Sequence, residues 1–109
     1  MGGKHDIYII EVEGEYRVRP AVAVVDGSPN KLKIRNMTQY TAVLVFPNDF
    51  LLAGTNPIQY ITSGEKLELD LTDFTDGIPV RFQYSVVISK EGEVVPATGE
   101  SAPSVIVDP

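Results

Sequence analysis

The sequence predicts an all-β domain, an antiparallel Greek-key β-sandwich, and three observations support this fold class. Apolar and polar residues alternate with a period of two along most of the chain, as in strands with one buried face. Clusters of Gly, Pro, Asn and Asp separate these runs, and no run of about ten residues has a helical period. About eight short strands in 109 residues are typical of one sandwich or barrel.

The N-terminal half contains four predicted strands. Residues 7–12 alternate clearly, and the next run, 16–25, contains Pro20, which cannot donate a ladder hydrogen bond. We therefore expect an edge strand or a bend at that proline. Residues 31–35 place Leu and Ile on one face and Lys and Arg on the other. Residues 42–46 are apolar throughout, which predicts a strand buried on both faces.

The C-terminal half begins with the longest irregular stretch, residues 48–57. Asn48 or Asp49 is placed to cap a single helical turn there, and Gly54 is placed to end it. The remaining predicted strands cover residues 58–62, 67–72, 80–88, 94–95 and 104–107, with Gly- or Pro-containing turns between most of them.

Composition excludes several classes of function. The net charge is −6 at pH 7 and the pI is near 4.6, so we expect neither a nucleic-acid partner nor binding to an anionic membrane. The chain has no Cys, which excludes disulfides, thiolate nucleophiles and thiolate metal ligands. Its one His, His5, lies near the N-terminus without a catalytic companion. We therefore expect no enzyme activity.

The domain organisation is expected to be simple. Residues 1–6 are interpreted as an N-terminal tail, in which Gly2 and Gly3 are typical of a cloning remnant, and residues 7–109 as a single β-sandwich. No apolar run is long enough for a secretory leader or a membrane span, so we expect no membrane insertion. The localisation is left open between cytoplasmic, for the chain as written, and periplasmic or extracellular, if a leader was removed.

The order of segments resembles the cupredoxins, the β-sandwich family of the small blue copper proteins. The resemblance covers about three-quarters of the chain and would also fit other Greek-key sandwiches, so an immunoglobulin-like sandwich is the alternative. It is carried by residues 32–36 (LKIRN), 42–46 (AVLVF), 62–69 (TSGEKLEL), 82–84 (FQY) and 105–107 (VIV).

The copper ligands of that family are absent from the matching positions. A type 1 copper site needs two His, one Cys and usually a weak axial Met. The position of the first His corresponds to Ala42 and that of the Cys to Val86, while Met37 has no ligand partners nearby in the sequence. The resemblance therefore implies a cupredoxin-like fold without copper, and we expect no cofactor.

A calcium site is the alternative metal hypothesis. Asp70, Asp73 and Asp76 recur every third residue and could supply oxygen ligands. Their spacing differs from that of an EF-hand loop, and Asp and Thr side chains at a strand end also commonly cap turns. The sequence leaves both interpretations open, with turn capping favoured.

A protein-interaction surface is the remaining functional feature. Phe50, Leu51 and Leu52 are adjacent in a predicted loop, where they either tuck over one end of the sandwich or form a contact patch. Tyr40, Tyr60 and Phe74 are candidates to join that patch, and the edge strand at 16–25 is a candidate for strand addition. We therefore predict a non-catalytic interaction or structural module that binds a protein partner or self-associates; the alternative is a metal-binding module.

Overall fold

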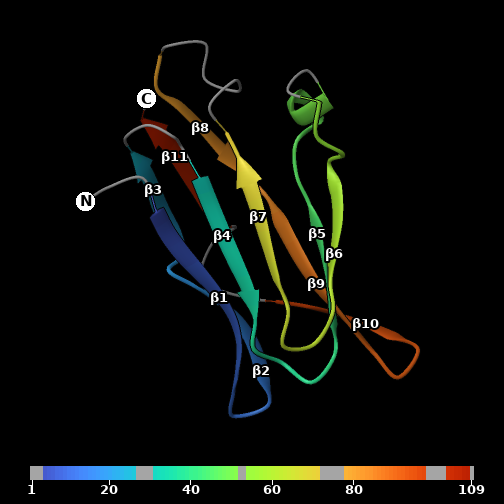
Figure 1. Ribbon diagram of the computed structural model, residues 1–109. Helices are drawn as coiled ribbons and strands as arrows, with labels where there is room; N and C mark the ends of the chain where they lie inside the picture. Colours follow the sequence, from blue (N-terminus) through green and yellow to red (C-terminus); the bar gives the residue numbers. More distant parts are fainter. Residues whose placement is uncertain (1–3, 27–30, 52–53, 72–77, 98–102, 109) are drawn as a thin grey trace.

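The computed structural model describes residues 4–26, 31–51, 54–71, 78–97 and 103–108 (Figure 1). The first sheet, sheet A, has the order β2 (Glu15–Arg19), β1 (Lys4–Val12), β4 (Lys31–Asn36), β7 (Lys66–Asp70). Sheet B has the order β3 (Val22–Asp26), β11 (Ser104–Asp108), β8 (Val80–Gln83). Sheet C has the order β10 (Glu93–Pro96), β9 (Ser85–Lys90), β5 (Thr41–Val45), β6 (Ile58–Ile61).

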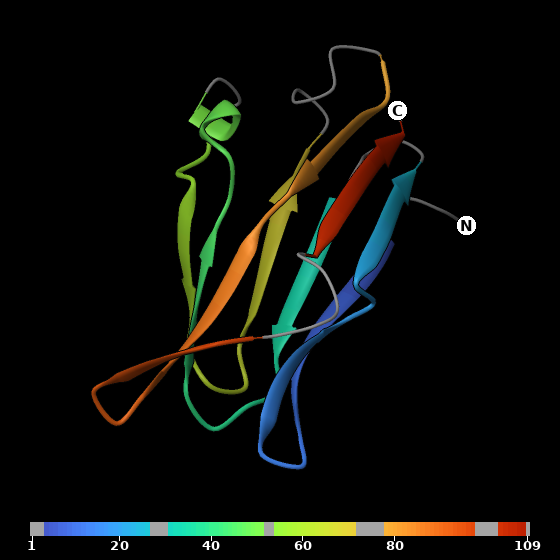
Figure 2. The same ribbon diagram turned by 180° about the vertical axis from the view of Figure 1, so that it is seen from behind.

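Sheets B and C together form the layer opposite sheet A. β8 and β9 are separated only by Tyr84, so one continuous segment runs through both sheets (Figure 2). The alternation of buried side chains is unbroken along it, from Phe82 through Val86 to Ile88. The predicted single strand over residues 80–88 is therefore two strands, but its predicted inner face is confirmed. The all-β, sandwich-like fold class is confirmed as well.

The strand pairing departs from the predicted antiparallel arrangement at two places. β1 pairs with β4 in parallel, and β11 pairs with β3 in parallel, whereas every other described pair is antiparallel. The first of these arises because the chain leaves sheet A after β2 and returns to it at β4. A period of two shows which side chains face inward but not which strand lies alongside, so the alternation could not reveal these pairs.

Pro20 lies where the chain changes sheets. β2 ends at Arg19 on the edge of sheet A, the Arg19–Pro20 peptide bond is cis, and β3 begins at Val22 on the edge of sheet B. The sequence prediction of an edge strand or a bend at this proline is confirmed in both respects.

Two local predictions need correction, and the predicted helical turn is confirmed. β1 begins at Lys4, three residues before the predicted start of the first strand, because residues 4–6 extend the parallel ladder with β4. β5 is buried on one face only, since Val45 on its other face is 43% exposed. The predicted helical turn is a 3-10 helix, η1 (Asn48–Leu51), followed by Gly54 with a φ of 76°.

The core lies between the two layers and comes from the inward-facing residues of their strands. Sheet A contributes Ile7, Ile9, Tyr16, Val18, Leu32, Ile34 and Leu69. Sheets B and C contribute Ala23, Val25, Ala42, Leu44, Ile61, Phe82, Val86, Ile88, Val105 and Val107. At the η1 end the core is aromatic: the Phe46 ring stacks on Phe50 at 4.7 Å and on Tyr84 at 5.4 Å between centroids.

A buried asparagine connects sheet A to sheet C at the other end. Asn36 is fully buried at the end of β4, and its Nδ2 donates to the carbonyl oxygens of Tyr40 (2.7 Å) and Ile61 (2.8 Å). Its Oδ1 accepts from the backbone N–H (2.9 Å) and the hydroxyl (2.7 Å) of Thr38. All four hydrogen-bonding positions of the amide are thus used, as a buried polar group requires.

Candidate protein-interaction surface

The outer face of sheet A is charged. Cross-strand neighbours share a face, and here Lys33 of β4 lies opposite Asp6 of β1 and Glu68 of β7. The Lys66 ammonium, 3.2 Å from the Glu68 carboxylate, donates a hydrogen bond that, together with the charges of Lys66 and Lys33, lowers the pKa of Glu68. Lysines and carboxylates therefore alternate on a solvated face, and the basic side of residues 31–35 belongs to it.

The outer face of sheet C is apolar. Inward and outward side chains alternate along its strands, as they do in sheet A. Ala42, Leu44 and Ile61 point into the core. The residues between them point outward, and they are aliphatic or aromatic where those of sheet A are ionic. We define the sheet C face as Val43, Val45, Ile58, Tyr60, Val87, Val94 and Pro96.

Strand register makes this face continuous. Val43 lies opposite Tyr60 on β6 and opposite Val87 on β9, and Val87 lies opposite Pro96 on β10. These four residues form one row across the sheet, because directly opposed residues approach within about 5 Å. In the neighbouring row, Val45 lies opposite Ile58.

Four of these side chains are strongly exposed, whereas Val43 and Val87 in the middle of the row are half-buried. Tyr60 is 69% exposed, Ile58 46%, Val45 43% and Val94 70%. The outward positions between them are Thr41, Ser85 and Ser89, so this face carries no charged side chain within the described strands of sheet C. A contiguous exposed apolar patch of this kind marks an interaction surface more often than isolated apolar residues do.

Two features of the surroundings make the sheet C face accessible. β6 is the edge strand of sheet C, so its outer residues border solvent on one side. The β9–β10 hairpin extends away from the sandwich at the opposite edge, where it carries Val94 (Figure 1). At that edge, the Lys90 ammonium lies 5.7 Å from the centre of the Tyr40 ring, a cation–π contact.

The contact patch predicted from residues 50–52 needs correction. Phe50 is only 1% exposed, because η1 folds its ring onto Phe46 and into edge contact with Phe82 at 4.9 Å. Phe50 therefore belongs to the core, as the tucked alternative predicts. The side chain of Leu51, and Leu52 as a whole, lie outside the described part of the chain.

Of the residues expected to join that patch, only Tyr60 proves to be strongly exposed. Tyr40 is half-buried and packs against the core, and Phe74 lies outside the described residues. Sequence reasoning missed Val43 and Val45, because an apolar run in a strand is equally consistent with burial on both faces. Ser85, which lies opposite Val45 on β9, and Ser89, which lies opposite Thr41, are polar residues on the same face and indicate that this side of the sheet is solvated.

The positions that correspond to copper ligands do not fit copper. Ala42 and Val86 are both buried on neighbouring strands and offer no donor atom. The described residues contain no group of three or more His, Cys, Asp or Glu side chains that could hold a metal ion. Of the calcium candidates, Asp70 is exposed at the end of β7, while Asp73 and Asp76 lie outside the described residues, so the geometry of that trio is not defined.

Comparisons with known proteins assign no family to this chain. The chain matches no protein-family model, and a search of curated proteins finds no similar sequence. Within the described residues, no helix has the length and apolar character needed to span a membrane.

Proposed function

We propose that this chain is a non-catalytic, cupredoxin-like β-sandwich without type 1 copper that acts as a protein-interaction or structural module. The observation that carries the proposal is the uncharged, exposed sheet C face, which contrasts with the charged outer face of sheet A. We further propose that its occupant is a second copy of the chain. The single His and the absence of Cys, which exclude most catalytic constellations, favour a non-catalytic role.

The position of the first strand supports the cupredoxin-like assignment over the immunoglobulin-like one. In a constant-type immunoglobulin sheet the first strand lies at the edge of an antiparallel four-stranded sheet. Here β1 lies between β2 and β4 and runs parallel to β4. Asn36, which closes the segment that resembles the family's Asn-ending strand, holds the loop that leads into β5.

Electrostatics favour self-association through the sheet C face over other surfaces. Each copy carries a net charge of −6, so two copies repel one another at long range, and a contact that keeps their charged surfaces apart is favoured. If two sheet C faces pack together, the two outer faces of sheet A lie three sheet spacings apart, about 30 Å. This distance exceeds the Debye length of about 8 Å at physiological salt, so the repulsion between those faces is screened. Such a contact is isologous and closes as a dimer.

Sedimentation velocity over a concentration series tests the proposal. We expect a reversible monomer–dimer equilibrium for the wild type. Tyr60→Glu should shift it toward monomer by at least about tenfold, because an unpaired carboxylate would be desolvated in the interface. The matched control is Tyr8→Glu, the same change at an exposed tyrosine on sheet A, which should leave the equilibrium unchanged.

Two results would contradict the proposal. One is a wild type that stays monomeric at every concentration, which would remove the second copy as the occupant. The other is an equal loss of dimer in both variants, which would show that added negative charge, and not the sheet C face, controls association. Circular dichroism of each variant establishes that it is folded.

A further inference from the structure

The ladder between β5 and β9 ends at a proline. Its last described pair is Val45 with Ser85, and the same register would place Phe46 opposite Tyr84 and then Pro47 opposite Gln83. Pro47 has no N–H to donate, and the chain turns there into η1, where the Pro47 carbonyl accepts from the N–H of Phe50 at 3.0 Å. Beyond this point, no described strand pairs with β8 on the β5 side.

One hydrogen bond shows which residues of β8 direct their backbone N–H and C=O groups toward β11. The N–H of Tyr84 donates to the carbonyl of Pro103 at 3.1 Å, and this pair continues the β8–β11 register. Hydrogen-bonded and non-hydrogen-bonded pairs alternate in an antiparallel ladder, so Phe82 and Val80 bond to β11. The backbone N–H and C=O groups of Arg81 and Gln83 therefore point the other way, toward Pro47.

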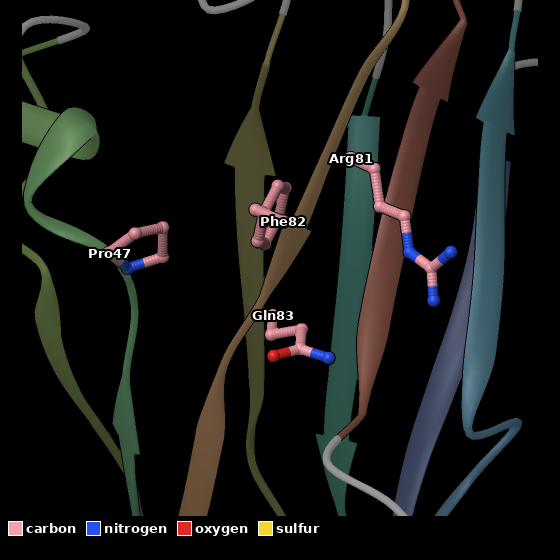
Figure 3. A pocket seen from close by; sticks show the side chains of 4 residues that line it. All are labelled: Pro47, Arg81, Phe82 and Gln83. Atoms are coloured by element: carbon pink, nitrogen blue, oxygen red, sulfur yellow. The ribbon is translucent and has the colours of Figure 1, made fainter.

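A cleft lies on that side of β8. It measures about 520 Å³, and its described lining is Pro47, Arg81, Phe82 and Gln83. Figure 3 shows Pro47 across the opening from β8, with the Arg81 side chain directed toward β11 and away from Pro47. The cleft is thus bordered by a strand edge whose outward backbone groups face no strand among the described residues.

We propose that this cleft binds an extended segment of a partner protein, which adds to β8 as a strand and bonds to the backbone of Arg81 and Gln83. Strand addition is the recognition mode that an open edge beside a cleft supports, because main-chain hydrogen bonds supply affinity and neighbouring pockets select side chains. The site borders the sheet C face at Val45 and Ser85 but uses the backbone edge of β8, so the proposal does not require self-association.

Side-chain preferences follow from the two faces of β8. Arg81 is exposed and forms no ion pair with any described residue, so its side chain, which extends over β11 in the unbound protein, can turn toward an acidic residue on the added strand and form a favourable cross-strand pair. Phe82 faces inward and contacts the Phe50 ring, so the adjacent inward residue of the segment should be apolar. The preferred ligand is an extended peptide that alternates apolar and acidic residues.

The test uses a synthetic hexapeptide of alternating glutamate and valine with the full chain carrying Tyr60→Glu, so that self-association does not interfere. In the free protein, the amide protons of Arg81 and Gln83 should exchange rapidly with solvent, and that of Phe82 slowly. We expect saturable binding that slows exchange at Arg81 and Gln83. A peptide with the same side chains but N-methylated backbone amides should not bind, because it cannot donate to the edge.

A charge reversal probes the acidic preference. Arg81→Glu should weaken binding of the glutamate peptide about fivefold, because this is the change in Kd that corresponds to the loss of one cross-strand charge pair. The same variant should favour a lysine–valine peptide. Arg35→Glu, the same reversal on sheet A, is the matched control and should change neither affinity. The proposal is overturned by no saturable binding up to about 1 mM. Equal binding of the N-methylated peptide, or binding that leaves both amides unprotected, would also overturn it.

Discussion

Replacing Asn36 by Asp is the most informative perturbation of the fold, because it changes one buried group without changing its shape. The amide Nδ2 donates to the Tyr40 and Ile61 carbonyls at 2.7 and 2.8 Å. In Asn36→Asp an oxygen takes its place, facing two carbonyl oxygens. The acceptor side, which binds Thr38, is retained.

The loss in the free energy of unfolding caused by Asn36→Asp has two contributions. If the new carboxyl is protonated it donates one bond and leaves one carbonyl without its donor, which costs about 1–3 kcal/mol. Keeping the carboxyl protonated at pH 7, against an ordinary pKa of about 3.9, costs about 1.4 kcal/mol per pH unit, or about 4 kcal/mol. The total of about 5–7 kcal/mol compares with about 5–15 kcal/mol for a whole domain.

The sign of the pH dependence follows from linkage. Burial against carbonyl oxygens raises the pKa of the new carboxyl in the folded state, so the folded variant binds more protons than the unfolded one above about pH 4. Stability relative to wild type therefore falls as pH rises from about 4, by up to about 1.4 kcal/mol per unit. Below about pH 4 only the loss of one hydrogen bond remains.

Urea unfolding of both proteins between pH 4 and 8 measures this difference. The control is Asn48→Asp, the same chemical change at an exposed residue in η1, which should stay within about 0.5 kcal/mol of wild type. A difference for Asn36→Asp that does not change with pH would refute the reasoning, because it would mean that the new carboxyl is solvated in the folded protein.

Two further substitutions test the core. Phe50→Ala should destabilise the fold by about 3–5 kcal/mol in thermal or urea unfolding, because it removes a buried ring stacked on Phe46; a change near zero would mean that η1 does not close the core. Tyr84→Phe should stay within about 1 kcal/mol at neutral pH, because it removes a buried hydroxyl with no hydrogen-bond partner among the described residues. Burial raises the pKa of Tyr84, so wild-type stability should fall above about pH 10 as the unfolded tyrosine ionises, and the fall should be smaller in Tyr84→Phe; equal slopes would contradict this.

The inner faces of the strands could be predicted from the sequence, whereas their neighbours could not. Leu32 and Ile34 face the core as their alternation predicts, and Pro20 marks the change of sheet. The parallel pairing of β1 with β4 has no local signature, because side-chain alternation is the same beside either neighbour. Strand order comes from how both layers pack, which is a property of the whole chain.

Which residues form the candidate surface could likewise be predicted only in part from the sequence. Phe50 and Tyr60 are both aromatic residues near the ends of apolar segments, yet one is 1% and the other 69% exposed. A 3-10 turn folds Phe50 over the end of the core, whereas Tyr60 alternates with the buried Ile61 on an edge strand. Hydrophobicity identified both residues as candidates, and only the three-dimensional fold shows which of them is exposed.

The most direct test of the interaction surface is a dilution series followed by amide NMR spectra of the uniformly labelled wild type. We predict concentration-dependent shifts at Val43, Val45, Ile58 and Tyr60, and constant shifts across β1 and β4 of sheet A. Shifts confined to sheet A would contradict the account. Spectra that do not change at any concentration would contradict it equally, since a second copy could not then be the occupant of the sheet C face.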